Sequence, residues 1–133
     1  MSAQENKEIV RRCIAAFNAK DLEALDEVVA SAYQEAMHNQ LAGGYRMFPG
    51  HHIEITDMLA EGDQVWVRLA TSGRYAGGWL DIPASDVQWT NTGIYFYRLA
   101  GGKIVEGQGL FDVMNHIRQL GGKIVPVEPG ETE

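Results

Sequence analysis

The stretch "HIEITDMLAEGDQVWVRLATS", residues 52–72, decides the fold, because its apolar side chains fall on every second position. Ile53 and Ile55 begin this alternation, and it resumes at Val65 after the segment "EGD" at 61–63. A period of two is typical of strands that bury one face, and a short Gly-containing segment between two such runs is typical of a hairpin turn. The sequence therefore predicts two antiparallel strands joined at 61–63.

Upstream of residue 52 the apolar residues follow a helical period instead. The segment "SAQE" at 2–5 fits a capping box, and Asp21 is a second candidate N-cap. Apolar residues at helical spacing follow both: Ile9, Val10, Cys13, Ile14 and Phe17 after the first, and Leu22, Leu25, Val28 and Val29 after the second. Beyond Ser31 the pattern weakens, and "QLAGGYRMFPG" has the composition of a loop. We therefore expect a short segment without a helix between His38 and Pro49.

Downstream, the sequence predicts two more strands and a last helix. The strands cover about 87–99 and 103–111, and the helix covers 113–120 and ends at two glycines. Helices followed by hairpin-connected strands predict an α+β fold, with the helices packed on one face of a curved antiparallel sheet. We expect one domain over residues 1–124 and a flexible tail over 125–133, where Pro and acidic residues dominate.

The composition is typical of a small globular protein without a nucleic-acid or membrane partner. The 133 residues have a formal net charge of −7 and no basic cluster beyond Arg11-Arg12. No apolar run approaches the ~18 residues of a membrane span, and the N-terminus lacks a signal-peptide core, which predicts a cytoplasmic protein. The single cysteine, Cys13, lies on the apolar face of a helix and is expected to be a core residue.

Asp112 stands between the last strand and the last helix, among apolar neighbours, and two interpretations of it stay open. Asp is a favoured N-cap, and a helix begins at the next residue. Alternatively, period two places Asp112 on the same strand face as Gln108 and Leu110, and in an apolar cavity its raised pKa would make it a general base.

The four histidines do not form a metal site in the sequence pattern. His38-Asn39 follows the second helix, where a histidine and a carboxylate form common acid–base pairs. His51 and His52 are adjacent on an expected strand, so their side chains should point to opposite faces. His116 is expected on the surface of the last helix. We predict no metal and no cofactor, because no metal-ligand spacing and no nucleotide-binding motif is present.

The strand at 87–99 has two unlike faces, and we assign one to a cavity and the other to a partner. The expected cavity set is Val65, Val67, Leu69, Thr90, Thr92, Ile94, Phe96, Gln108, Leu110 and Asp112. The expected partner set is Trp66, Trp89, Tyr95 and Tyr97, which form a large apolar patch. We therefore expect a homodimer through this second set.

Several local strings resemble the SnoaL-like polyketide cyclase family, within the nuclear-transport-factor-2-like (cystatin-like cone) superfamily. The strings are "FPGHHIEITDMLAEGDQVWVRLATSG", "LDIPAS", "AMHN" and "YRLAGGKIVEGQGLFDVMNHIRQLGG", and the resemblance covers roughly residues 5–122. It implies that the curved antiparallel sheet wraps around the N-terminal helices as a cone with an apolar pocket, and usually a dimer. It also implies that Asp112 is the general base of an intramolecular aldol closure and that His38 is the family histidine.

The chain departs from this family pattern at two points and differs from the related epoxide hydrolases at a third. Gln108 replaces the family's Trp on the last strand, which implies a more polar pocket. The short segment after His38 implies that a covering helix is missing. Leu69 and Thr71 stand where related epoxide hydrolases keep an Arg and an Asp, which argues against that activity.

Two functions of different classes follow from these observations. The first is cofactor-free acid–base chemistry α to a carbonyl, of cyclase or isomerase type, on a small hydrophobic carbonyl compound. Asp112 would abstract the proton, His38 would orient it, and Asn39 or Gln108 would hydrogen-bond the enolate. The remaining substrate-binding residues would be Leu69, Thr92, Ile94, Phe96 and Leu110. The alternative is a non-catalytic ligand-binding or interaction module on the same fold.

Overall fold

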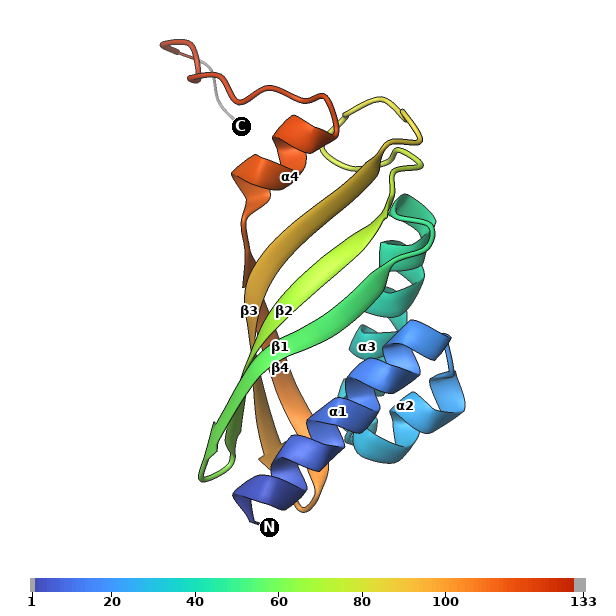
Figure 1. The fold of residues 1–133 in the computed structure, drawn as a ribbon, viewed down its shortest axis with the longest axis vertical. Coiled ribbons are helices and arrows are strands. Elements are labelled where there is room, and N and C mark those ends of the chain that lie inside the picture. The colour runs from blue at the N-terminus through green and yellow to red at the C-terminus, as the bar shows by residue number, and fades with distance from the viewer. Residues whose placement is uncertain (1, 131–133) are drawn as a thin grey trace.

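The computed structural model describes residues 2–130 and shows four helices and one four-stranded antiparallel sheet. In chain order these are α1 (Ala3–Ala19), α2 (Leu22–Val28), α3 (Ser31–Met47), β1 (His52–Glu61), β2 (Gln64–Arg74), β3 (Gln88–Ala100), β4 (Lys103–Phe111) and α4 (Val113–Gln119). Neighbouring strands in the chain are neighbours in the sheet. Figure 1 shows α1, α2 and α3 together on one side of the twisted sheet and α4 at its upper end. The predicted α+β cone is confirmed.

The predicted caps of the first two helices are confirmed. At α1, the Ser2 hydroxyl accepts a hydrogen bond from the Glu5 backbone N–H, and the Glu5 carboxylate accepts one from the Ser2 N–H. At α2, the Asp21 carboxylate accepts a hydrogen bond from the Ala24 N–H. These contacts satisfy N–H groups that would otherwise have no partner at the start of a helix.

The segment expected as a short loop is a full helix, so that expectation was wrong. α3 runs through Gly43 and Gly44 and carries both His38 and Asn39. A glycine inside a helix costs about 1 kcal/mol relative to Ala, which is why the composition indicated a loop. Packing outweighs that cost here, because Met37 and Leu41 on the same helix are buried in the main core. The helix that the short segment after His38 implied to be missing is therefore present.

The two faces of β3 are the reverse of those assigned from the sequence. Trp89, Asn91, Tyr95 and Tyr97 are buried under the helices, whereas Thr90, Thr92 and Ile94 are exposed. The register explains this, because Val67 of β2 lies directly opposite Tyr95. Residues directly opposite in an antiparallel pair share a face. Val67 is buried as expected, so Tyr95 and its alternate neighbours are buried with it.

β4 turns its glycines inward and its longer side chains outward. Gly109 lies opposite Tyr95, and a Cβ built at Gly109 would meet the Tyr95 ring at 2.6 Å. A Cβ at Gly93 of β3 would meet the Phe111 ring at 2.3 Å. Both positions therefore require glycine for steric reasons. Gln108 and Leu110 alternate with these glycines and lie exposed on the outer face.

The core has two parts. The main part lies between the helices and the sheet, and a smaller cluster at the end near α4 comprises Phe48, Tyr75, Ile82, Trp89 and Leu120. Residues 123–128 form no helix or strand. The tail expected over 125–133 extends into residues 131–133, which lie outside the described residues. None of the helices described between residues 2 and 130 is both long and apolar enough to cross a membrane.

Candidate functional site

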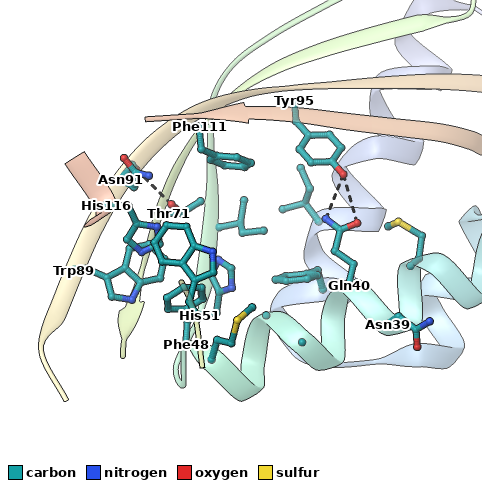
Figure 2. Close-up of a pocket in the computed structure, with 18 of the residues that line it drawn as sticks. Asn39, Gln40, Phe48, His51, Thr71, Trp89, Asn91, Tyr95, Phe111 and His116 are labelled. Atoms are coloured by element: carbon teal, nitrogen blue, oxygen red, sulfur yellow. Dashed lines mark hydrogen bonds between the residues drawn. The ribbon is translucent and has the colours of Figure 1, made fainter. Parts of the chain in front are cut away.

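A cavity of about 460 Å³ lies between α3, the inner face of the sheet and α4 (Figure 2). Its apolar wall is formed by Cys13, Ile14, Phe17, Met37, Met47, Phe48, Ile53, Trp79, Trp89, Tyr97, Phe111 and Val113, together with Gly43 and Gly44. Its polar lining is formed by Asn39, Gln40, His51, Thr71, Asn91, Tyr95 and His116. A cavity of this size, mainly apolar with a few polar groups, is typical of a small-molecule site.

No Asp, Glu, Lys or Arg is among the residues that line this cavity. Its titratable groups are all shifted toward their neutral forms, chiefly because burial disfavours charge. Burial raises the pKa of Cys13 to about 12 and raises those of Tyr95 and Tyr97. Burial also lowers the pKa of His51 to about 4 and lowers that of His116. The lining is therefore uncharged near neutral pH.

His51 and His116 reach the cavity from different elements and pack on the same two rings. His51 immediately precedes β1, and its ring centroid lies 6.0 Å from that of Phe48 and 5.5 Å from that of Trp89. His116 comes from α4, and the corresponding distances are 4.9 Å and 4.2 Å. The two imidazoles therefore belong to one aromatic cluster at one end of the cavity.

Each imidazole has one buried nitrogen without a hydrogen-bond partner among the described residues, Nδ1 in His51 and Nε2 in His116. A buried polar atom left unpaired costs about 1–3 kcal/mol. Neither of these two nitrogens has accessible surface, so a ligand in the cavity meets other atoms of the two rings.

Asn91 fixes α4, and with it His116, to the sheet. Its side-chain amide donates a hydrogen bond to the backbone carbonyl of Asp112 at 3.2 Å and accepts one from the Asn115 amide at 3.2 Å. The Thr71 hydroxyl donates to the Asn91 backbone carbonyl at 3.5 Å. Thr71 and Asn91 are buried, so these contacts hold the imidazole end of the cavity in place.

Tyr95 and Gln40 form a second polar group in the same cavity. The Tyr95 hydroxyl lies 3.2 Å from Nε2 of Gln40 and 3.5 Å from its Oε1, so it is able to accept a hydrogen bond from one and donate to the other. Figure 2 shows this pair on the opposite side of the cavity from His51 and His116, with Phe111 between the two groups.

Asp112 caps α4 and does not line the cavity. Its side chain is exposed and accepts a hydrogen bond from the Asn115 backbone N–H at 3.1 Å. Of the two interpretations left open by the sequence, the structure therefore shows the N-cap. Because the carboxylate lies outside the cavity lining, the expectation that it reaches the pocket was wrong.

His38 also lies away from the cavity lining. Its Nε2 is 2.6 Å from Oδ1 of Asp26 on α2, and the two side chains are 35% and 36% exposed. The expected histidine–carboxylate pair thus exists, but with Asp26 and not with Asp112. Exposure to solvent weakens such a pair, and nothing in this geometry connects it to the pocket.

Among the expected substrate-binding residues, only Asn39 lines the cavity. Leu69 is buried in the main core and is not part of the lining. The others lie on the outer face of the sheet, for the reason of register given above: Thr92, Ile94, Phe96, Gln108 and Leu110. The expected convergence of these residues on one cavity was wrong.

Neither imidazole was expected from the sequence to line a pocket. His116 was expected on the surface, but it is only 9% exposed. Its spacing from Val113 and Leu120, at i+3 and i+7, was the available signal, since all three lie on one helix face. Of His51 and His52, only His51 lines the cavity, and His52 is exposed. No group of three His, Cys, Asp or Glu side chains among the described residues is arranged to hold a metal ion.

Comparison with known proteins relates the sequence to a family. The sequence matches the family described as SnoaL-like polyketide cyclase over residues 7–120. Comparison with curated proteins gives no match. The three solved structures described next are 16–22% identical to this chain, so their likeness shows the fold alone.

Three similar solved structures illustrate the shared fold. TsrD from Streptomyces laurentii is 22% identical, with a TM-score of 0.84 over 92% of this chain and 99% of that chain. A SnoaL-like polyketide cyclase from Agrobacterium tumefaciens is 16% identical, with a TM-score of 0.79 over 90% and 99%. A protein with a ketosteroid isomerase-like fold from Catenulispora acidiphila, solved with trimethylamine, is 19% identical, with a TM-score of 0.72 over 90% and 98%.

Proposed function

This chain belongs to the SnoaL-like polyketide cyclase family, and from that membership we propose that it catalyses a cyclase-type ring closure next to a carbonyl group without a cofactor. The observation that carries the proposal is an uncharged cavity with two imidazoles in its lining. A neutral imidazole is both a proton acceptor and a hydrogen-bond donor near neutral pH. Acid–base chemistry of this kind needs both.

The substrate is a neutral, mainly apolar molecule. A charged ligand would lose its hydration on entry and would find no opposite charge in the lining, so its burial would be costly. An apolar ring system, in contrast, gains from contact with aromatic side chains such as Phe48, Trp79 and Phe111.

In this proposal His116 is the base and His51 is the hydrogen-bond donor. The pKa of His51, lowered to about 4, makes it a weak base that stays neutral, so its N–H is suited to stabilise an enolate oxygen. His116 removes the proton α to the carbonyl, and the electron pair of that C–H bond forms the new bond to a second carbonyl carbon of the same molecule. The second carbonyl oxygen then takes the proton from the imidazolium, which restores the base.

The proton-abstraction step is testable without the natural substrate. 2-Tetralone is a neutral bicyclic ketone, and exchange of its α-protons for deuterium in D₂O is followed by NMR. We expect the protein to accelerate the exchange and His116→Gln to reduce that acceleration by about 10²-fold or more, as is typical for loss of a general base. The rate should fall as pH drops through the pKa of His116, which burial lowers below the ordinary histidine value of about 6.5, because the protonated imidazole is no longer a base.

Asp112→Asn is the matched control, because it preserves the cap and removes the carboxylate. We expect its exchange rate to equal that of the unchanged protein. Loss of exchange in Asp112→Asn with full activity in His116→Gln would instead assign the base to Asp112, as the family resemblance implied. Absence of acceleration in the unchanged protein, with 2-tetralone bound, would favour the non-catalytic binding module.

A further inference from the structure

The last strand of the sheet separates from β3 before it reaches the other end of β3. Phe111 of β4 pairs with Gly93, and the last backbone contact beyond that pair is a hydrogen bond from the Asp112 N–H to the Thr92 carbonyl at 3.3 Å. β3 starts further back, so its first residues have no strand on that side. Backbone groups two residues apart on a strand face the same side. The N–H and carbonyl of Thr90 therefore point into the space that β4 leaves.

The side-chain amide of Gln119 on α4 occupies that space and binds Thr90 as a strand residue would. Its Oε1 accepts a hydrogen bond from the Thr90 N–H at 3.0 Å, and its Nε2 donates to the Thr90 carbonyl at 2.6 Å. A hydrogen-bonded pair in an antiparallel sheet exchanges the same two bonds. Asn115, one turn earlier on the same face of α4, donates to the Thr90 carbonyl at 3.4 Å and to the Asn91 side chain at 3.2 Å. Side-chain amides thus join α4 to β3 where strand pairing stops.

The position of α4 matters to the cavity, because α4 supplies part of its wall. Val113 and His116 line the cavity, and Figure 1 shows α4 beside the upper end of β3. A helix of seven residues is too short to be stable alone, so contacts with the rest of the protein decide where it lies. Leu120 packs in the smaller core cluster, but apolar contacts are not directional. The two hydrogen bonds of Gln119 are directional and require one register of α4 against β3.

We propose that Gln119 is a positioning residue: by taking the place of the missing strand at Thr90, it fixes α4 and the part of the cavity wall that α4 carries, including His116. For its catalytic consequence this role rests on the proposed function, in which His116 is the base. Gln119 itself lies outside the cavity lining, so it acts on the substrate only through α4. Loss of its two hydrogen bonds displaces α4 without removing any group that contacts the ligand.

Gln119→Met tests this role, because it removes both hydrogen bonds and keeps the length and helix propensity of the side chain. The His116 ring centroid lies 4.2 Å from that of Trp89, so the NMR chemical shifts of the His116 ring protons report where α4 lies. We expect these shifts to move toward their values in the unfolded chain. In the 2-tetralone exchange, kcat should fall by about 10-fold or more and KM should change by less than about twofold. The base is then misplaced, whereas the apolar walls from other elements still bind the ketone.

Arg118→Met is the matched control. Arg118 precedes Gln119 on α4, is exposed and lies outside the cavity lining, so the same new side chain there should leave the shifts, kcat and KM unchanged. Unchanged shifts and kcat in Gln119→Met, with only a lower free energy of unfolding in urea, would give Gln119 a purely structural role and overturn the inference. If the unchanged protein did not accelerate the exchange at all, the proposed function would fail, and the His116 shifts would still decide whether Gln119 positions α4.

Discussion

Burial of His51 couples folding to pH. Its folded pKa of about 4 lies below the ordinary value of 6.5, so between these values the unfolded chain binds a proton that the folded chain does not. The free energy of unfolding is therefore highest above about pH 6.5 and falls as pH drops through this window, by up to about 3 kcal/mol from His51. His116 acts in the same direction, because its pKa is also lowered by burial.

His51→Phe should weaken the dependence of the free energy of unfolding on pH. Phenylalanine keeps the contacts with Phe17 and Trp89 and has no proton to bind. Urea unfolding at pH 7.5, 5.5 and 4.5 measures the difference. His52→Phe, at the exposed neighbouring position, should keep the slope of the unchanged protein. If the free energy of unfolding fell equally with pH in the unchanged protein and in both variants, His51 would not titrate as its burial requires.

At the scale of an element, the connection between β2 and β3 stores backbone strain beside the cavity. Leu80 and Asp81 have positive φ values of 50° and 58°, and the Ile82 N–H closes the turn by donating to the Trp79 carbonyl at 2.9 Å. Two consecutive positive φ values define a type I′ turn, which favours Asn-Gly and costs a non-glycine residue about 1 kcal/mol or more. This turn holds Trp79 in the cavity wall.

Replacing the pair by Leu80→Asn with Asp81→Gly should raise the free energy of unfolding by about 1 kcal/mol. Leu80 is 59% exposed, so little packing is lost. Thermal unfolding measures the gain as a higher Tm. Leu80→Val, which is β-branched and tolerates positive φ poorly, should lower it. A Tm that does not rise in the Asn-Gly variant would mean that the turn carries no strain.

Most helices and strands were predicted correctly from the sequence, whereas the residues of the site were not. The period of two in β2 and the turn at 61–63 depend on local residues, and both were predicted. The face of β3 was not, because Tyr95 and Phe96 are both aromatic and the choice depends on register with Val67. Likewise α3 appeared as a loop because Gly44 lowers local helix propensity, whereas tertiary contacts decide its conformation. The pocket lining depends on these two choices, so its residues were largely missed.

At the scale of the whole molecule, the outer face of the sheet carries the apolar surface that a dimer would bury. Leu59, Trp66 and Phe96 lie directly opposite one another across three strands, and Ile94 lies opposite Leu110. Leu59, Trp66, Ile94 and Leu110 are 75%, 48%, 42% and 77% exposed. Of the residues expected to form this patch, Trp89, Tyr95 and Tyr97 are buried inside, so only Trp66 remains in it.

We predict a two-fold homodimer through this outer face. Ile94→Glu should produce monomers, because it places a charge on this apolar face beside Leu110. Sedimentation velocity at micromolar concentration measures the change. Leu80→Glu introduces the same charge at an exposed leucine away from the sheet face and should remain dimeric. A monomeric unchanged protein under these conditions would contradict the prediction.

A glycine in the cavity lining provides a way for the accepted ligand to change during evolution. Gly44 lines the cavity, and a Cβ there would lie 3.3 Å from Nδ1 of His51. A single-nucleotide change from glycine to alanine would therefore alter the room beside the imidazole while every polar residue stayed the same. Descendants of one ancestor are able to diverge in the ligand they accept at such a codon.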